Sequence, residues 1–257
     1  MSNGLAGRRV LVTAGAGGIG LAVAEHLIAQ GCRLFVCDVA QEALREFSAR
    51  FPEHGCVAAD VANDADVERL FGEVRERLGG LDALVNNAGI AGPTGGVDEI
   101  DPKEWRRCID VCLTGQFLCT RLAVPLLRQA GGGSIVNMSS AAGKYGYAFR
   151  TPYSSAKFGV IGLTQSLAKE LGPQGIRVNA ILPGIVEGPR MEGVIRSRAA
   201  QLGIGYEEME ARYLERISLR RMVTPGDVAN MISFLISDAG RNISGQSIAV
   251  DGNVETL

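Results

Sequence analysis

The stretch Thr13-Ala14-Gly15-Ala16-Gly17-Gly18-Ile19-Gly20 decides the fold of this chain. It follows a short apolar run that starts at Arg9, and it precedes a segment, ending at Gln30, in which apolar residues recur at helical spacing. A buried strand, a glycine-rich turn and a helix in this order form the context in which a chain binds a dinucleotide. The glycines let the backbone approach a pyrophosphate, and the helix N-terminus favours its negative charge. Tight turns also need glycine for steric reasons, so the turn alone is weak evidence.

The carboxylate of Asp38 follows the next predicted strand, residues 33–37, and lies eighteen residues after Gly20. At that position a carboxylate can accept hydrogen bonds from both hydroxyls of an adenosine ribose, and it repels a 2′-phosphate. The sequence therefore favours NAD over NADP as the cofactor. The alternative is that Asp38 only caps the helix predicted for residues 41–51.

Strands and helices alternate along the rest of the chain. The remaining predicted strands span residues 55–61, 81–85, 134–138, 177–182 and 247–250. The remaining predicted helices span residues 63–78, 101–129 with a kink at Pro125, 151–171, 187–216 and 224–237. This alternation is typical of a parallel sheet with helices on both faces. The sequence thus predicts an α/β protein: one domain over residues 1–257 with a doubly wound, seven-stranded Rossmann fold, whose functional residues meet at the carboxyl ends of the strands.

The composition is that of an ordinary globular protein, since 46% of the 257 residues are apolar, 21% are charged and the net charge is −2. The weak negative charge gives no support for nucleic acid as a partner. No apolar run approaches the ~18 residues of a membrane helix, and the polar start is unlike a secretory signal, so we expect a cytoplasmic protein. The six cysteines include no CxxC pair, which favours neither a disulfide framework nor a metal site.

Tyr153 and Lys157 are candidates for acid–base chemistry. Side chains four residues apart lie on the same face of a helix, and Thr151-Pro152 has the form of an N-cap followed by proline in the first turn. The positive end of the helix dipole and the neighbouring ammonium both favour an ionised phenol, provided that this helix end faces a partly dry cleft. Taken alone, the spacing is common enough to be accidental.

Together these features resemble the short-chain dehydrogenase/reductase family, and the resemblance covers nearly the whole chain. It rests on the glycine-rich stretch, Asp60, Asn86-Asn87-Ala88-Gly89, Ser140 thirteen residues before Tyr153, Tyr153-x-x-x-Lys157, Pro183-Gly184 and the closing Gly245-Gln246…Val250-Asp251-Gly252. The resemblance implies hydride transfer between an alcohol and NAD. Tyr153 would then be the general base or acid, Lys157 would support it and hold the nicotinamide ribose, and Ser140 would bind the reacting oxygen.

The resemblance also implies a set of cofactor contacts along the carboxyl edge of the sheet. These residues are Thr13, Gly15, Gly18, Ile19, Gly20, Asp38, Asp60, Val61, Asn87, Ala88, Gly89, Tyr153, Lys157, Pro183, Gly184 and Ile185.

Three positions depart from the family pattern. Ala14 stands where the family usually has its first glycine, and because alanine lacks easy access to positive φ, we expect the turn to be rebuilt around Gly15. Cys112 stands where the family has an active-site asparagine that helps to anchor a water linking the lysine to solvent. A thiol is a weak donor, so we expect the main-chain carbonyl of residue 112 to hold that water. Gly188 stands where a threonine often contacts the nicotinamide amide.

The segment of about residues 187–218 resembles the variable substrate flap of the family. Arg190 in this flap, or Arg150 just before Tyr153, is a candidate to pair with an anionic group of the substrate, because guanidinium groups suit carboxylate, sulfonate and phosphate. The alternative is that these arginines only face solvent.

Two other functions stay open at this stage. One is 3-oxoacyl reduction, which Asp38 disfavours because such reductases usually use NADPH. The other is a catalytically silent NAD-binding regulator, which Cys112 keeps open.

The resemblance further implies a homotetramer or homodimer, built through the helices around 103–129 and 153–171 and the C-terminal strand.

Overall fold

A seven-stranded parallel sheet forms the centre of the protein in a computed structural model that describes residues 4–254, apart from the side chains of Arg190 and Gln201. The strands are β1 (Arg9–Thr13), β2 (Arg33–Asp38), β3 (Gly55–Ala58), β4 (Ala83–Asn86), β5 (Gly133–Met138), β6 (Ile176–Pro183) and β7 (Ser247–Val250). Their order is β3-β2-β1-β4-β5-β6-β7. The chain steps outward from β1 and then returns to its other side with β4, so the strand order reverses between β1 and β4. In open sheets of this kind, ligands bind beyond the carboxyl ends of the strands at the reversal.

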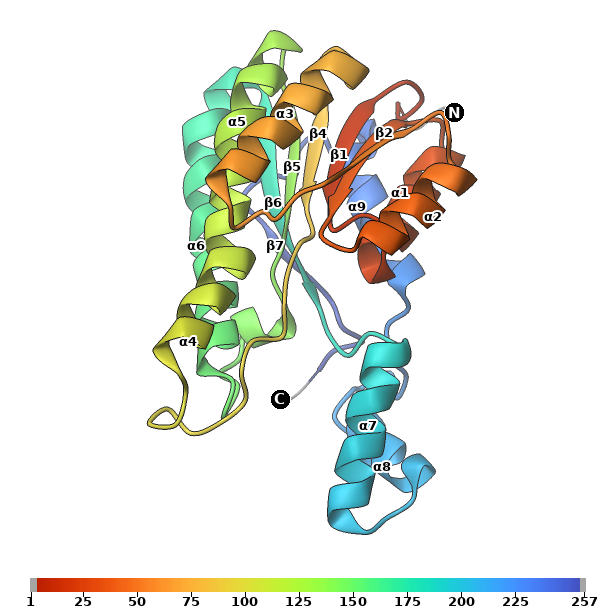
Figure 1. The fold of residues 1–257 in the computed structure, drawn as a ribbon, viewed down its shortest axis with the longest axis vertical. Helices are drawn as coiled ribbons and strands as arrows, with labels where there is room; N and C mark the ends of the chain where they lie inside the picture. The colour runs from red at the N-terminus through yellow and green to blue at the C-terminus, as the bar shows by residue number, and fades with distance from the viewer. Residues whose placement is uncertain (1–3, 255–257) are drawn as a thin grey trace.

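Helices cover both faces of the sheet, which confirms the predicted fold class (Figure 1). Helices α1 (Gly18–Ala29), α2 (Gln41–Arg50) and α9 (Pro225–Ile236) lie on one face, and α3 (Asp64–Leu78), α5 (Gly115–Gln129) and α6 (Thr151–Leu171) lie on the other. Because side chains of a strand alternate between the two faces, β1 contributes to two cores. Val10 and Val12 pack in the cluster that includes α1 and α9, whereas Leu11 packs in the cluster that includes α3 and α5.

The long helix predicted for residues 101–129 has an interruption that the sequence did not predict. It consists of α4 (Pro102–Ile109), the π-helical turn η1 (Asp110–Thr114) and α5, and Pro125 lies inside α5. The break is therefore at the turn that contains Cys112. Such π turns are often found at functional sites.

The same helical stretch, Pro102–Gln129, has the length and apolar composition to cross a membrane, although no such segment was expected from the sequence. This is weak evidence, because a core helix of a soluble protein meets the same test, and 44% of its most apolar part is buried inside the protein. Its residues pack against α3, α6 and the sheet.

The predicted flap forms two helices rather than one. Helices α7 (Pro189–Leu202) and α8 (Tyr206–Leu214) are separated at Gly203, whose φ of 66° ends α7 in the left-handed conformation. They project from the body of the molecule (Figure 1). Their apolar side chains form a small cluster of their own around Ile195, Ala199 and Met209.

The remaining differences lie at element ends. Strand β3 stops at Ala58 rather than at residue 61, and β4 begins at Ala83 rather than at residue 81. Helix α6 begins at Thr151, with Arg150 as its N-cap, so the predicted capping role of Thr151 is wrong by one residue. Short turns η2 (Ala141–Gly143), η3 (Gly172–Gln174) and η4 (Asp238–Gly240) complete the described chain.

Candidate active site

The glycine-rich turn connects β1 to α1 at the strand-order reversal. Ala14 itself adopts φ of 49°, so the expectation that the turn is rebuilt around Gly15 is wrong. Gly15 and Gly20 are required by packing, since a Cβ would lie 2.8 Å from Val36 Cβ at the first and 2.0 Å from the Ala14 oxygen at the second. At Gly17 an added Cβ meets nothing within 4 Å. Gly17 is also the N-cap of α1 and offers no capping side chain, so the helix N-terminus is open to an anion.

The segment after β4 is tied to this turn by Thr13 and Asn87. Thr13 Oγ1 accepts hydrogen bonds from the backbone N–H groups of Asn87 and Ala88, both at 3.0 Å. The Asn87 amide in turn donates to the carbonyls of Thr13 and Ala14, at 3.0 and 3.1 Å. These bonds fix the two sides of the crevice between β1 and β4 relative to each other.

Asp38 is the last residue of β2, and Asp60 lies two residues after the end of β3. Asp38 Oδ2 accepts from the Ala16 N–H at 3.3 Å, which places this carboxylate beside the glycine-rich turn. Asp60 forms an ion pair with Arg107 of α4 at 2.8 Å. Val61, which follows it, packs against Gly115, where an added Cβ would lie 2.7 Å from the valine Cγ2.

Lys157 and Tyr153 lie on the face of α6 that meets the carboxyl end of β5. Lys157 is 3% exposed, and its ammonium donates to the Met138 carbonyl at 2.7 Å. The ammonium nitrogen lies 5.6 Å from the centroid of the half-buried Tyr153 ring. Ser139 Oγ donates to the Lys157 carbonyl at 2.7 Å, which fixes this turn of α6 on the end of the strand.

Ser140 follows β5 and is held close to the start of α6. Its hydroxyl accepts from the Ala142 N–H at 3.2 Å. The Ala142 carbonyl accepts from Ser154 Oγ at 2.8 Å, so the turn that carries Ser140 is bound to the helix turn that carries Tyr153.

Known proteins of one family match this chain over nearly its whole length. The family model described as Enoyl-(Acyl carrier protein) reductase matches residues 14–254. A cis-4-hydroxycyclohexanecarboxylate dehydrogenase of Sinomonas cyclohexanicum is 37% identical over 98% of both chains. A putative ketoacyl reductase of Streptomyces coelicolor is 36% identical over 95% of both. Among solved structures, a variant actinorhodin polyketide ketoreductase with NADPH superimposes with a TM-score of 0.91 and 34% identity over 98% of both chains.

The chain belongs to the short-chain dehydrogenase/reductase superfamily. Its relatives are dehydrogenases and reductases that act on alcohols or ketones by name, which supports oxidoreductase activity. The superfamily uses nicotinamide cofactors.

In this short-chain dehydrogenase/reductase the thiol of Cys112 replaces the family asparagine with hydrogen bonds of its own. Cys112 Sγ lies 3.4 Å from both the N–H and the carbonyl oxygen of Ile90. The Cys112 carbonyl, which we expect to hold a water, accepts a hydrogen bond from Gln116 Nε2 at 3.1 Å. A carbonyl oxygen has two lone pairs, so this bond leaves room for a water as well.

Gln116 is a site residue that the sequence did not single out. Its amide nitrogen also donates at 3.0 Å to the Met138 carbonyl, the same oxygen that binds Lys157. Gln116 Oε1 and Asn86 Oδ1 are buried acceptors without a protein partner among the described residues. No motif marks Gln116, because its contact with the Met138 carbonyl, 22 residues away in the sequence, arises only in the folded protein.

Cys108 packs beside this turn. Cys108 is fully buried, and a hydrogen bond with Cys112 together with burial raises the pKa of the Cys108 thiol far above its usual range. A thiol is the weaker nucleophile, so Cys108 acts as a small apolar side chain.

Of the two arginines predicted to bind the substrate, the structure describes the side chain of Arg150 only. Arg150 stacks on the rings of Tyr147 and Tyr153, with its guanidinium carbon 5.4 and 5.2 Å from their centroids, and its Nη2 donates to the Ala91 carbonyl at 2.6 Å. The side chain of Arg190 lies outside the described part of the structure.

The Pro183-Gly184-Ile185 turn packs on the end of the chain. Gly184 donates to the Val250 carbonyl at 3.0 Å, and an added Cβ there would lie 2.6 Å from Asp251 Cβ. The Ile185 carbonyl accepts from the Val223 N–H at 2.9 Å. Gly188, the N-cap of α7, has φ of 137°, a conformation that a threonine would adopt only with strain.

Proposed function

We propose that this protein transfers a hydride between a secondary alcohol and NAD, with Tyr153 as the general acid–base, Lys157 as its supporting cation and Ser140 as the ligand of the reacting oxygen. The observation that carries the proposal is the buried ammonium of Lys157, fixed on the Met138 carbonyl and 5.6 Å from the Tyr153 ring. An ammonium removed from water interacts with a phenolate several times more strongly than it does in bulk solvent.

The proton transfer in this proposal runs between the alcohol and Tyr153. In oxidation, the phenolate oxygen of Tyr153 takes the hydroxyl proton of the alcohol. Ser140 Oγ meanwhile donates a hydrogen bond to the alcohol oxygen. When bound, the nicotinamide supplies the hydride chemistry. A positioned acid–base group of this kind typically contributes 10²–10⁴-fold to the rate.

The cofactor fits the turn after β1 in this proposal. The pyrophosphate would lie over Gly17 and Gly18, where added Cβ atoms meet nothing within 4 Å. Ile19, Asp60, Val61, Asn87 and Gly89 would contact the adenosine and ribose parts, and Pro183, Gly184 and Ile185 the carboxamide. Asp38 beside Ala16 favours NAD over NADP, because a 2′-phosphate would meet its carboxylate.

An anionic alcohol is the proposed substrate class. Arg150 places a guanidinium against the Tyr153 ring, and one relative is named for a hydroxycyclohexanecarboxylate. Arg190 remains a second candidate.

We also infer a homotetramer or homodimer in the cytoplasm. Exposed Phe117 on α5 and Phe158 on α6 support association through these helices, and sedimentation equilibrium would measure it.

The substitution Tyr153→Phe tests the catalytic role. We expect NADH formation to fall by about 10²-fold or more, because the phenolic proton carrier is removed, while the Kd for NAD stays within about threefold. Tyr145→Phe, in the neighbouring loop, is the matched control. Retention of most of the activity would contradict the acid–base assignment, and an inactive wild-type protein that binds NAD would favour the silent regulator.

The alternative function is reduction of a 3-oxoacyl thioester, which two relatives named as ketoacyl or polyketide ketoreductases favour. One screen separates the two. Secondary alcohols, polyols and hydroxy acids are assayed with NAD and NADP, and an acetoacetyl thioester with NADH and NADPH. We expect the highest kcat/KM with NAD and a hydroxy acid. Equal kcat/KM for neutral and anionic alcohols would remove the anion proposal, and preference for NADPH and the thioester would establish the alternative.

A further inference from the structure

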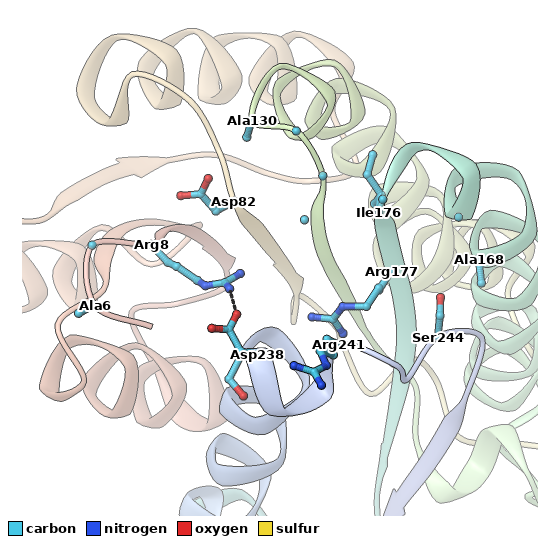
Figure 2. Close-up of a pocket in the computed structure, with 17 residues that line it drawn as sticks. Ala6, Arg8, Asp82, Ala130, Ala168, Ile176, Arg177, Asp238, Arg241 and Ser244 are labelled. Carbon is cyan, nitrogen blue, oxygen red and sulfur yellow. Dashed lines mark hydrogen bonds and ion pairs between the residues drawn. The ribbon is translucent and has the colours of Figure 1, made fainter. Parts of the chain in front are cut away.

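A cavity of about 780 Å³ lies at the amino ends of the strands, opposite the edge that carries Tyr153 and the glycine-rich turn (Figure 2). Arg8 immediately before β1, Asp82 immediately before β4, Gly133 at the start of β5 and Ile176 at the start of β6 line it. Its volume is within the range of pockets that hold small molecules. No residue proposed for the hydride transfer takes part in it.

Three arginine side chains line this cavity. Figure 2 shows Arg8, Arg177 and Arg241 turned toward one another around Asp238. Two carboxylates oppose them, but each already has a partner: Asp238 pairs with Arg8 at 2.6 Å, and Asp82 pairs with Arg9 at 2.6 Å. Within residues 4–254, neither Arg177 nor Arg241 has a carboxylate oxygen within 4 Å of its guanidinium.

Arg177 is the most informative member of this group. It is half-buried at the second position of β6, and its hydrogen bond to the Ile243 carbonyl is long, at 3.4 Å. Burial and the neighbouring guanidinium of Arg8 lower the pKa of Arg177, and Asp238 only partly offsets them. A half-buried cation with few acceptors is costly unless a ligand supplies the opposite charge.

The walls of the cavity leave space beside these cations. Gly7, Gly131 and Gly172 line it, and a Cβ added to any of them would meet nothing within 4 Å. A ligand can therefore approach the backbone here, as it does in other anion sites that are rich in glycine.

We propose that this cavity, which we call the amino-edge site, binds a phosphate group carried by a small metabolite, with Arg177 and Arg241 as its charged ligands. Two guanidinium groups without carboxylate partners match the charge of a phosphate monoester, and their planar donors suit its oxygens. The chain as a whole has a net charge of −2, so the positive charge is a local feature of this edge.

Calorimetric titration of the full-length protein tests the proposal. Inorganic phosphate, glycerol 3-phosphate and succinate are titrated in turn at constant ionic strength. Each titration is done without NAD and at saturating NAD, since the glycine-rich turn is a second place for phosphate. We expect one site per chain that NAD does not displace. Arg177→Met and Arg241→Ala should each weaken binding about tenfold or more, the effect of losing a charge-assisted hydrogen bond.

Arg212→Ala is the matched control. Arg212 is exposed on α8, pairs with Glu208 and does not line the amino-edge site. Exposed Arg241 keeps the proposal testable even if Arg177→Met fails to fold.

Absence of binding, loss of binding at saturating NAD, or equal affinity in the arginine variants and the control would each overturn the proposal. Tighter binding of succinate than of either phosphate would overturn the ligand class. Tighter binding of glycerol 3-phosphate than of inorganic phosphate supports a metabolite as the source.

Discussion

Cys112 takes over the hydrogen bonds of a polar residue while packing as an apolar one. Its side chain is fully buried against Cys108 and Ala156, yet its sulfur satisfies both backbone groups of Ile90. Through Gln116, the same residue is linked to the Met138 carbonyl that holds Lys157. The position of the ammonium therefore depends on this π turn as well as on α6.

Substitutions of Cys112 test separately what its hydrogen bonds contribute to turnover and what they contribute to stability. Asparagine can make the same bonds to Ile90, so we expect kcat of Cys112→Asn to stay within about threefold of the wild type or to rise. Cys112→Ala removes both hydrogen bonds to the partly buried backbone of Ile90 and should lower the free energy of unfolding by about 1–3 kcal/mol. Steady-state kinetics and urea denaturation measure the two effects. A tenfold or greater fall in kcat of a folded Asn variant would show that the thiol has a role of its own.

At the level of single elements, the sequence predicted those features that have a local cause. The glycine-rich turn, the strands and most helices follow from periodicity and turn residues. The π turn at residues 110–114 was missed because its five residues include no glycine or proline that would mark an interruption of the helix. Ala14 was misjudged because tertiary bonds from Asn87 hold its carbonyl and stabilise a strained φ that a local argument excludes. Gln116 was missed because only the fold places it beside Met138.

The turn after β1 gives a matched pair of substitutions. Gly20→Ala should lower the free energy of unfolding by about 1–3 kcal/mol or more, because its Cβ would lie 2.0 Å from the Ala14 oxygen. Gly17 has an extended backbone and open space, so for Gly17→Ala we expect only the cost of alanine at an N-cap, about 0.5–1 kcal/mol. The methyl group would nevertheless stand where the pyrophosphate is proposed to lie, and NAD affinity should fall about tenfold. Wild-type affinity in a calorimetric titration of Gly17→Ala would move the cofactor away from this turn.

At the scale of the whole molecule, the beginnings of β1 and β4 are held together by a charged contact between residues 73 positions apart. Asp82 accepts from the Arg9 backbone N–H at 2.8 Å and from its guanidinium at 2.6 and 2.9 Å. Burial alone would raise the pKa of Asp82, but the hydrogen bonds and charge of Arg9 outweigh it, and the pKa is lowered.

This shift predicts how stability depends on pH. A carboxyl whose pKa is lowered in the folded state stabilises that state above its unfolded pKa of about 3.9, and the contribution is lost as the pH falls through the lower folded value. Asp82→Asn should cost about 1–3 kcal/mol at pH 7 and flatten the acid limb of the stability curve. Urea denaturation between pH 7 and the acid range measures both, with Asp98→Asn in the exposed 97–100 loop as the control. An unchanged acid limb in Asp82→Asn would contradict the assignment.

Two backbone contacts join the two ends of the flap to the rest of the described chain: the Glu187 N–H donates to the Val223 carbonyl at 2.9 Å, and Ile217 forms a bridge with Val254. Because the buried members of the apolar cluster, Ile195, Ala199 and Met209, all belong to α7 and α8, we expect substitutions there to leave the Rossmann sheet undisturbed. We therefore expect the flap to differ between relatives while the residues proposed for hydride transfer stay the same. Such modularity offers a structural reason why relatives of similar length carry names as different as a cyclohexanecarboxylate dehydrogenase and a polyketide ketoreductase.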